Sequence, residues 1–526
     1  MTLTKRHPPT HARGDGGFAR KLTLIGVCAA TFMLLVDLMV VQVALPTIQR
    51  QVGGSFTDLQ WVIDAYALTL TATILAYGSA ADRYGRKRVF IAGVALFTLA
   101  SLLCGFANGV ALLIAARALQ GFGGAAMFAT GLALIGQEFE GEARGKAIAV
   151  WGATVGLASA AGPLLGGSVT DLLGWRYVFF LNVPIGIVTI ILAWRLANIG
   201  DPGATRLDWA GLVTFSASLS MLMVGVLRGN AEGWGSPLIV SLVVGSLLTM
   251  IVFVLVERRQ PRPMFDLALL RNPAFLGVSV ATLAIGAGMF AALPFVALYL
   301  QNELGYSPLM GGMCLLPGTA PCFIVPLATR SQTEKLPPGV VLAAGLASAA
   351  AGLGAMHMLS AASSWTDLVP GLILVGFGVG IANPAIGRIA LGVVPPQRTG
   401  MASGISNTFR VGGIALGVAA LGAVFEHHLN TSLREQLGQP SGRLTEVVAS
   451  GGTRAVYKLE PNRHSVVAAS HQAYVSSLDL LLMAGSVLVL LGAVAALVLI
   501  RHRHLHQAAA PVAPPPDRAA AVPASA

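Results

Sequence analysis

The sequence predicts an all-α integral membrane protein. Of its 526 residues 55% are hydrophobic and 11% are charged, whereas a soluble chain carries about a quarter charged residues. The apolar residues form long, uniformly apolar runs, about twice the length of a barrel strand and without its alternating pattern. The net charge of +11 comes from basic residues between these runs, not from one basic face. The composition therefore excludes a soluble enzyme, and we expect no nucleic-acid partner.

A membrane-spanning helix needs about 20 mainly apolar residues. By this criterion the sequence predicts fourteen transmembrane helices, at residues 24–45, 60–81, 89–107, 110–135, 147–169, 177–197, 209–228, 237–256, 274–300, 308–328, 339–359, 367–387, 400–424 and 477–500.

Basic residues predict how these helices are oriented. If the N-terminus is cytoplasmic, most of the 34 Lys and Arg residues fall in cytoplasmic segments, and the short outer loops hold only Arg50, Arg176 and Arg228. Because cytoplasmic loops carry the excess of basic residues, both termini are expected in the cytoplasm. The richness in Ala, Gly and Arg suggests a high-GC bacterial genome, and so a multi-pass protein of a bacterial inner (plasma) membrane.

Three polar segments lie outside the predicted spans. Residues 1–21 are basic and read as a cytoplasmic segment before a retained first helix, because the apolar run that follows has no cleavage site. Residues 425–476 contain Gly451, Gly452 and Pro461 and predict one extended outer loop. Residues 507–526 are rich in Ala and Pro and predict a disordered cytoplasmic tail.

Motifs of enzymes are missing from the sequence. It has no Walker A loop, no H-E-x-x-H and no G-x-S-x-G, so we expect no catalytic residues and no cofactor. The four cysteines lie in apolar runs, and the histidines do not have metal-ligand spacing, so no metal site is expected.

The loop between the second and third predicted spans carries a specific motif. It reads Gly78-Ser-Ala-Ala-Asp82-Arg83-Tyr-Gly85-Arg86-Lys87-Arg88, which resembles the cytoplasmic loop signature of the major facilitator superfamily. The fifth span contains Gly152-Ala-Thr-Val-Gly156 and then Gly162-Pro163-Leu-Leu-Gly166-Gly167, similar to the motif that marks antiporters in that superfamily.

Two further segments narrow the resemblance. Residues 174–186, GWRYVFFLNVPIG, and the first span, with Asp37 and Ala44-Leu45-Pro46, resemble the 14-span drug:proton antiporters of the EmrB/QacA type. The first span departs from that family at Met39 and Gln42, where the family usually has Thr and Asn. The second copy of the loop signature, expected near residues 326–335, has lost the Asp-Arg pair and the glycines. The resemblance covers about residues 22–500.

The resemblance implies a fold and a function. The fold is the major facilitator fold, with two six-helix bundles at residues 22–200 and 273–500 and an inserted helix pair at 207–258. The function is export of lipophilic cationic or neutral compounds by alternating access, coupled to protons, in a membrane lipid environment. One alternative function is dedicated export of one metabolite or of a self-made antibiotic, and another is that of a non-transporting membrane scaffold or receptor.

Three charged residues are candidates for proton coupling. Asp37 lies mid-membrane, where an unpaired carboxylate is costly and tends to take up a proton; its other reading is a structural partner of Arg117. Arg117 cannot shed its charge and needs a counter-ion, and the resemblance implies that it biases the protonation of a neighbouring carboxyl. Asp64, near the outer end of the second span, is a second titrating site, a contact for cationic substrate, or simply solvated.

The motif residues are candidates for gating and bending. The resemblance places Asp82 in a cytoplasmic gate against the start of the thirteenth span, with Arg83 and Arg86 holding the gate closed and Gly78 and Gly85 allowing close backbone approach. Gly156, Gly162, Pro163, Gly166 and Gly167 would form a close-packed hinge, or would serve packing alone. Possible cavity-lining residues are Trp61, Tyr66, Gln120, Asn407 and Arg410.

Overall fold

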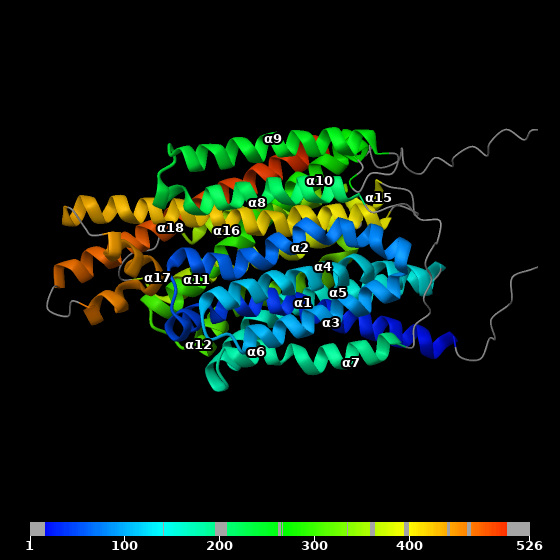
Figure 1. Cartoon of the computed structure of the whole chain (residues 1–526), viewed down its shortest axis with the longest axis horizontal. Coiled ribbons are helices and arrows are strands. Elements are labelled where there is room, and N and C mark those ends of the chain that lie inside the picture. Colours follow the sequence, from blue (N-terminus) through cyan, green and yellow to red (C-terminus); the bar gives the residue numbers. More distant parts are fainter. Residues whose placement is uncertain are drawn as a thin grey trace, which may run out of the picture.

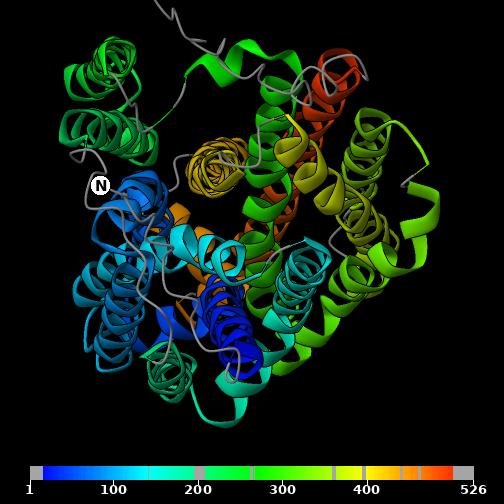
Figure 2. The ribbon, with the colours of Figure 1, turned by 90° about the vertical axis from the view of Figure 1, so that its right-hand side faces the viewer.

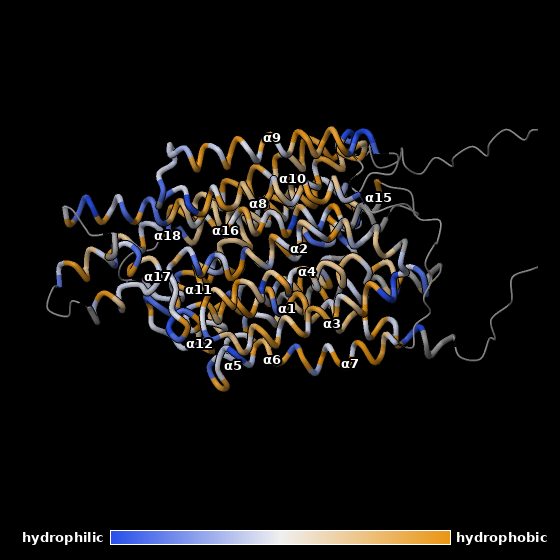
Figure 3. The backbone as a smooth tube through the Cα atoms, in the orientation of Figure 1, coloured by the Kyte–Doolittle hydropathy of each residue, from blue (hydrophilic) through white to orange (hydrophobic). Residues whose placement is uncertain are grey.

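The structure is a computed structural model, and it describes residues 16–139, 141–194, 208–260, 265, 267–333, 335–357, 363–393, 399–438, 442–459 and 464–501, apart from some side chains within the helices. Long helices run side by side along one direction (Figure 1). Their middle parts are apolar and their ends hydrophilic (Figure 3). This distribution is that of a multi-pass membrane protein.

The first part of the chain forms seven helices: α1 (Gly16–Val52), α2 (Phe56–Tyr84), α3 (Arg86–Gly105), α4 (Val110–Glu138), α5 (Gly141–Leu172), α6 (Arg176–Phe180) and α7 (Asn182–Trp194). Local sequence explains where several begin and end. Ser55 and Asp58 form a capping box at the start of α2. Gly85 joins α2 to α3 with φ 95°, a backbone conformation that favours glycine.

Helices α8 (Trp209–Glu232) and α9 (Pro237–Arg259) form a pair at the edge of the molecule (Figure 2). Ser218 Oγ donates to the Ser246 carbonyl and Ser246 Oγ donates to the Ser218 carbonyl, each at 2.8 Å, so each helix satisfies a polar group of the other. The pair is attached to the body of the protein through α8, because Asn230 Nδ2 donates to the Ala423 carbonyl at 2.6 Å.

The remaining chain forms the second half. Its elements are η1 (Leu267–Arg271), α10 (Pro273–Ile285), η2 (Gly286–Phe290), α11 (Ala291–Leu298), η3 (Tyr299–Glu303), α12 (Pro308–Cys314), α13 (Leu316–Thr333), α14 (Pro338–Ala355), η4 (Trp365–Leu368), α15 (Val369–Gly392), α16 (Thr399–Leu437), α17 (Gly442–Leu459) and α18 (His464–Leu499). The segments η2 and η3 are single π-helical turns within the run that begins at α10.

The described residues contain eleven helices long and apolar enough to cross a membrane, or twelve if the bent pair α12 and α13 counts as one span. Helices α2 and α5 occupy the two other predicted positions, so each of the fourteen predicted spans coincides with helical structure. The count of fourteen membrane crossings stays a prediction.

The prediction of an extended loop at residues 425–476 is wrong for its described part. Helix α16 continues to Leu437, α17 fills most of the middle, and α18 begins at His464 instead of residue 477. The segment is too polar to span a membrane, but a helix outside the membrane needs only one apolar face. In α17 that face includes Val448, Ala449 and Val456, all buried.

The two halves contact each other at the end of the molecule that carries α17, called here the α17 end (left in Figure 1). The rings of Phe56 in α2, Phe295 in α11 and Phe425 in α16 lie with their centroids 5.8 to 6.0 Å apart. Gln60 Nε2 also donates to the Val418 carbonyl at 3.1 Å. Helix α1 begins and α18 ends at the opposite end.

Candidate functional site

A buried ion pair lies at the centre of the first half. Arg117 Nη1 of α4 donates to Asp37 Oδ2 of α1 at 2.5 Å, and the two side chains are 1% and 0% exposed. The sequence predicted both residues as mid-membrane charges, and the structure brings them together. Removing one partner of such a pair leaves the other charge buried and costs about 3–5 kcal/mol.

Two amide side chains complete the surroundings of the Asp37 carboxylate. Gln120 Nε2 and Asn182 Nδ2 each donate to Oδ1 at 2.9 Å. The same two amides donate to Ser101 Oγ, at 3.2 and 2.9 Å. Both oxygens of Asp37 are therefore held by donors from α4 and α7, and we call Asp37, Arg117, Gln120, Asn182 and Ser101 the Asp37 network.

Arg117 makes four further contacts that fix its guanidinium. Its Nε donates to the Val62 carbonyl at 3.1 Å, and its Nη1 donates to Gln120 Oε1 at 2.7 Å. Its guanidinium carbon lies 4.2 Å from the centre of the Tyr66 ring and 5.9 Å from that of Phe179, both cation–π contacts. The charge of Arg117 is thus balanced by one carboxylate, two carbonyl-type oxygens and two aromatic faces.

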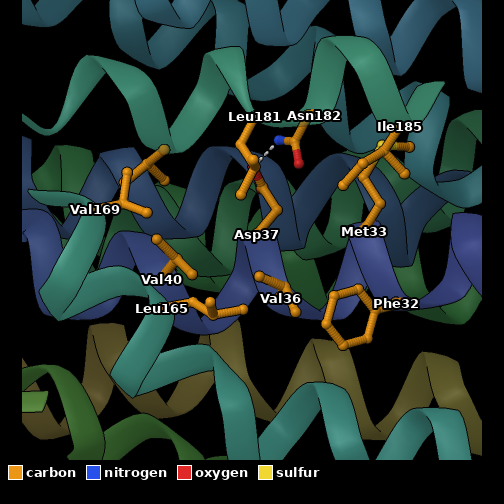
Figure 4. Close-up of a pocket in the computed structure, with 11 residues that line it drawn as sticks. Phe32, Met33, Val36, Asp37, Val40, Leu165, Val169, Leu181, Asn182 and Ile185 are labelled. Atoms are coloured by element: carbon orange, nitrogen blue, oxygen red, sulfur yellow. Dashed lines mark hydrogen bonds between the residues drawn. The ribbon is translucent and has the colours of Figure 1, made fainter. Parts of the chain in front are cut away.

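A small crevice reaches the Asp37 network from the side. Its walls come from α1, α5 and the α6–α7 region, and Figure 4 shows Asp37 and Asn182 on one side of it. The other walls are apolar: Phe32, Met33, Val36, Val40, Leu165, Val169, Val178, Leu181 and Ile185. The polar groups of the network point toward each other, and apolar side chains separate them from the outer surface of the helices.

Asp64 contrasts with Asp37. It is 0% exposed, and neither of its carboxylate oxygens has a hydrogen-bond partner among the described residues. The interpretation of Asp64 as a simply solvated residue is therefore wrong. Although Asp64 lies close to the start of α2, this part of the helix is covered by α4 and α16. Nearby, Gln60 donates to the Val418 carbonyl of α16, and the Val62 carbonyl accepts from Arg117 of α4.

The predicted gate residues lie at the junction of α2 and α3. The side chains of Asp82 and Arg83 lie outside the described residues, so their contacts stay a prediction. Gly78 lies within α2, with open space where a Cβ would stand. Arg86 Nη1 donates to the Ala133 carbonyl of α4 at 3.1 Å, which ties the start of α3 to α4 within the first half.

The predicted hinge glycines lie where α5 touches two other helices. A Cβ at Gly162 would stand 2.4 Å from Met39 Cβ, and one at Gly166 would stand 2.9 Å from Val40 Cα, both in α1. A Cβ at Gly167 would stand 2.4 Å from the Pro308 carbonyl oxygen of α12. Pro163 is buried within α5, and the surroundings of Gly156 lie outside the described part of the chain. Helix α5 thus packs closely against α1 of the first half and α12 of the second half.

The residues predicted to line a cavity fall into two groups. Tyr66 and Gln120 are 0% exposed and belong to the surroundings of Arg117 and Asp37, not to an open space. Trp61, Asn407 and Arg410 are partly buried, on α2 and α16. Arg410 Nε is buried with no hydrogen-bond partner among the described residues.

Sequence reasoning missed two members of the Asp37 network and one further polar cluster. Asn182 lies in the segment GWRYVFFLNVPIG and Ser101 in the third predicted span, and neither is assigned a function from the sequence. The feature that could have identified them is a polar side chain within an apolar run. Glu303 and His471 form a second pair, with His471 Nδ1 2.8 Å from Glu303 Oε2, in which the Glu303 side chain is 0% exposed and that of His471 is 24% exposed.

We compared the chain with known protein families and with individual proteins. The Major Facilitator Superfamily matches residues 27–418. The multidrug resistance protein Stp of Mycobacterium tuberculosis is 34% identical over 419 residues, which are 79% of this chain and 78% of that protein. The tetracenomycin C resistance and export protein of Streptomyces glaucescens is 29% identical over 490 residues, 90% of each chain.

A solved structure has the same fold. The crystal structure of a bacterial homologue of the human lysosomal transporter Spinster, in an inward-facing and unoccupied conformation, aligns with a TM-score of 0.61 and 17% identity. The alignment covers 93% of this chain and 98% of that one.

Proposed function

The chain belongs to the major facilitator superfamily and is a transporter rather than an enzyme, and we propose that it is a proton-coupled exporter of lipophilic cationic or neutral compounds. The observation that carries the proposal is the buried Asp37 network. A carboxylate and a guanidinium held together within apolar helices are costly to maintain, and such groups in membrane proteins mark ion and substrate pathways.

Asp37 would carry the transported proton. When a proton binds to the carboxylate, its attraction to Arg117 is lost, while Arg117 keeps its charge and still needs a counter-charge. The relative position of α1 and α4 therefore depends on the protonation of Asp37. Helix α1 also reaches the second half, since Gln301 Nε2 donates to the Val43 carbonyl at 2.7 Å. Protonation can thus bias the contact between the halves, as alternating access requires.

Asp64 would be the second acid of the pathway. It is as buried as Asp37, but among the described residues no donor contacts its carboxylate, whereas Arg117, Gln120 and Asn182 contact that of Asp37. A buried carboxylate without hydrogen-bond donors is less stable in its charged form than one with donors, so the two acids should differ in how readily they bind a proton. Arg117, as the partner of Asp37, would set which of the two is charged.

The gate and hinge assignments complete the proposed cycle. Asp82, Arg83 and Arg86, with Gly78 and Gly85, would close the end opposite α17 against the start of α16. Close packing of Gly162, Pro163, Gly166 and Gly167 would let α5 pivot between α1 and α12. The chain would cross the membrane fourteen times, in two six-helix bundles with α8 and α9 inserted between them. Both of its termini would lie in the cytoplasm of a bacterial cell.

The names of the relatives support export, but they differ in the number of compounds that the relatives are said to act on. One is a multidrug resistance protein and another a resistance and export protein for tetracenomycin C. We favour several substrates of one physical class, because a site between apolar helices selects by size and charge more than by shape. A dedicated exporter of one antibiotic or metabolite is the second candidate, favoured by the tetracenomycin relative, which aligns over 90% of each chain.

The test is proton movement in everted membrane vesicles. With a proton gradient imposed, addition of a transported compound should dissipate the gradient only in vesicles that contain the protein. A panel of lipophilic cations, neutral ring compounds and multiply anionic compounds should give responses to the first two groups. A response to one compound alone would support the dedicated exporter, and no response to any compound would contradict proton-coupled export.

A further inference from the structure

Glu303 is an acid outside the Asp37 network whose side chain is buried. Its side chain is 0% exposed, and it is the last residue of η3, at the α17 end of the molecule. The backbone N–H of Thr453 donates to its Oε1 at 2.7 Å, and the Thr453 hydroxyl donates to its Oε2 at 2.5 Å. His471 Nδ1 lies 2.8 Å from Oε2. One carboxylate therefore binds α17 and α18 together.

Glycine allows this contact. Gly452 has φ 64°, which interrupts the helical geometry of α17 directly before Thr453. A Cβ at Gly452 would stand 2.6 Å from Glu303 Oε1. The break in α17 therefore both presents the Thr453 N–H and leaves space for the carboxylate, and a residue with a side chain would prevent both.

The residues before Glu303 extend these contacts to the first half. Asn302 Nδ2 donates to the Ser450 carbonyl of α17 at 2.9 Å. Gln301 Nε2 donates to the Val43 carbonyl of α1 at 2.7 Å. Three consecutive side chains of η3 thus bind α1, α17 and α18. Val43 follows Asp37 by six residues, which is about 9 Å along the helix.

We propose that Glu303 is a positioning residue of the transport cycle, which holds α17 and η3 together so that Gln301 keeps the α17 end closed against α1. This inference rests on the proposed function, in which the α17 end is the outer side and must open for substrate release. Opening requires α1 to leave Gln301. The Glu303 contacts fix η3 in the position from which Gln301 reaches Val43, so they stabilise the closed state relative to the open one.

The surroundings of Glu303 explain why one acid can have this effect. Hydrogen bonds to an ionised carboxylate are about twice as strong as those between neutral groups, and burial strengthens them further. The cleft beside Glu303 is lined by Thr453, Arg454 and Tyr457 of α17 and by His464, Val467, Ala468 and His471 of α18, so both helices that Glu303 contacts border it. The buried Glu303 carboxylate is the group through which η3 contacts both α17 and α18.

The experiment measures opening directly. Nitroxide labels are placed at Asn108, in the exposed turn between α3 and α4, and at Thr431, exposed on α16, after the four native cysteines are replaced. Distances between the labels are measured by pulsed electron spin resonance in reconstituted full-length protein. Glu303→Gln should increase the population of long distances about threefold, as expected when contacts of one state are weakened.

Matched variants separate positioning from general damage. Thr453→Val removes the hydroxyl donor at nearly constant volume and should lengthen the distances in the same direction, whereas Thr453→Ser keeps the donor and should behave as the parent. Glu435→Gln changes an exposed acid at the same end, on α16, and should also behave as the parent. Export by Glu303→Gln should show a changed kcat at a nearly constant KM.

Two results would overturn the inference. One is an unchanged distance distribution in both Glu303→Gln and Thr453→Val, and the other is an equal change in Glu435→Gln. If Glu303→Gln does not fold, the pair Thr453→Val and Thr453→Ser decides alone. Proton flux in vesicles of the parent protein is measured separately, so an absence of proton coupling would leave the distance result valid.

Discussion

Asp37 and Arg117 neutralise each other as a pair with side chains 0% and 1% exposed, so neither can be changed without affecting the other. We predict that Asp37→Asn abolishes proton-driven export and also lowers stability by about 3–5 kcal/mol, because Arg117 is left as an unpaired buried charge. Export is measured in vesicles and stability by thermal unfolding in detergent.

A double variant separates the two effects. Asp37→Asn with Arg117→Gln removes both charges and should recover most of the lost stability but none of the export. Recovery of export together with stability would mean that the pair is structural only. Asp171→Asn, at an exposed acid of α5, is the control and should change neither property.

Asp64 should respond differently, since its carboxylate has no hydrogen-bond partner in the described part of the chain. We predict that Asp64→Asn changes stability by less than about 1 kcal/mol, because none of the described hydrogen bonds is broken and a buried charge is avoided. As an acid of the proton pathway, Asp64 should be needed for every substrate, so export of monovalent cations and of neutral compounds should fall together. Loss of cation export alone in a side-by-side efflux assay would mean that Asp64 acts in substrate selection instead of proton coupling.

The sequence was sufficient to locate these charges and to offer Arg117 as a partner of Asp37, but not to identify the amide side chains that complete the network. Asp37 and Arg117 stand out because ionised residues are rare in apolar runs. Asn182 is 145 positions from Asp37 in sequence, and its hydrogen bond exists only because α7 packs beside α1. Burial of Asp64 likewise depends on α2 being covered by other helices, which hydropathy along one helix does not report.

At the level of elements, the glycines of α5 set how closely helices of the two halves can approach. We predict that Gly167→Ala, whose Cβ would stand 2.4 Å from the Pro308 carbonyl oxygen, separates α5 from α12, lowers stability by about 1–3 kcal/mol and reduces export. Gly152→Ala lies on the same helix with nothing within 4 Å and serves as the control. Equal thermal stability of the two variants would contradict the packing role.

Helical structure was well predicted where apolar runs are long, since a backbone in lipid must satisfy its own hydrogen bonds. The prediction failed at residues 425–476, because hydropathy detects helices that face lipid and overlooks amphipathic ones that pack on protein. The π-helical turns η2 and η3 carry no such signal either. Turn η3 places Gln301 against α1, Asn302 against α17, and Glu303 against both α17 and α18.

At the scale of the whole molecule, α1 begins and α18 ends at the same end of the helix bundle, opposite α17 (Figure 1). With the bias of Lys and Arg between loops, this leads us to predict that both termini are cytoplasmic. A fluorescent protein fused after residue 526 should fluoresce in a bacterial host, whereas alkaline phosphatase fused there should be inactive. The opposite pair of signals would reverse the orientation, and α17 would then lie inside the cell.

The Asp37 network has one more property, which concerns how the protein can change in evolution. All of its side chains come from residues 37–182, within the first half of the chain. Mutations in the second half can therefore alter what a descendant of this protein recognises without disturbing the buried charges. Divergence of substrates among relatives is then expected to accumulate in one half of the gene, while the other half is restrained by a single group of five mutually dependent side chains.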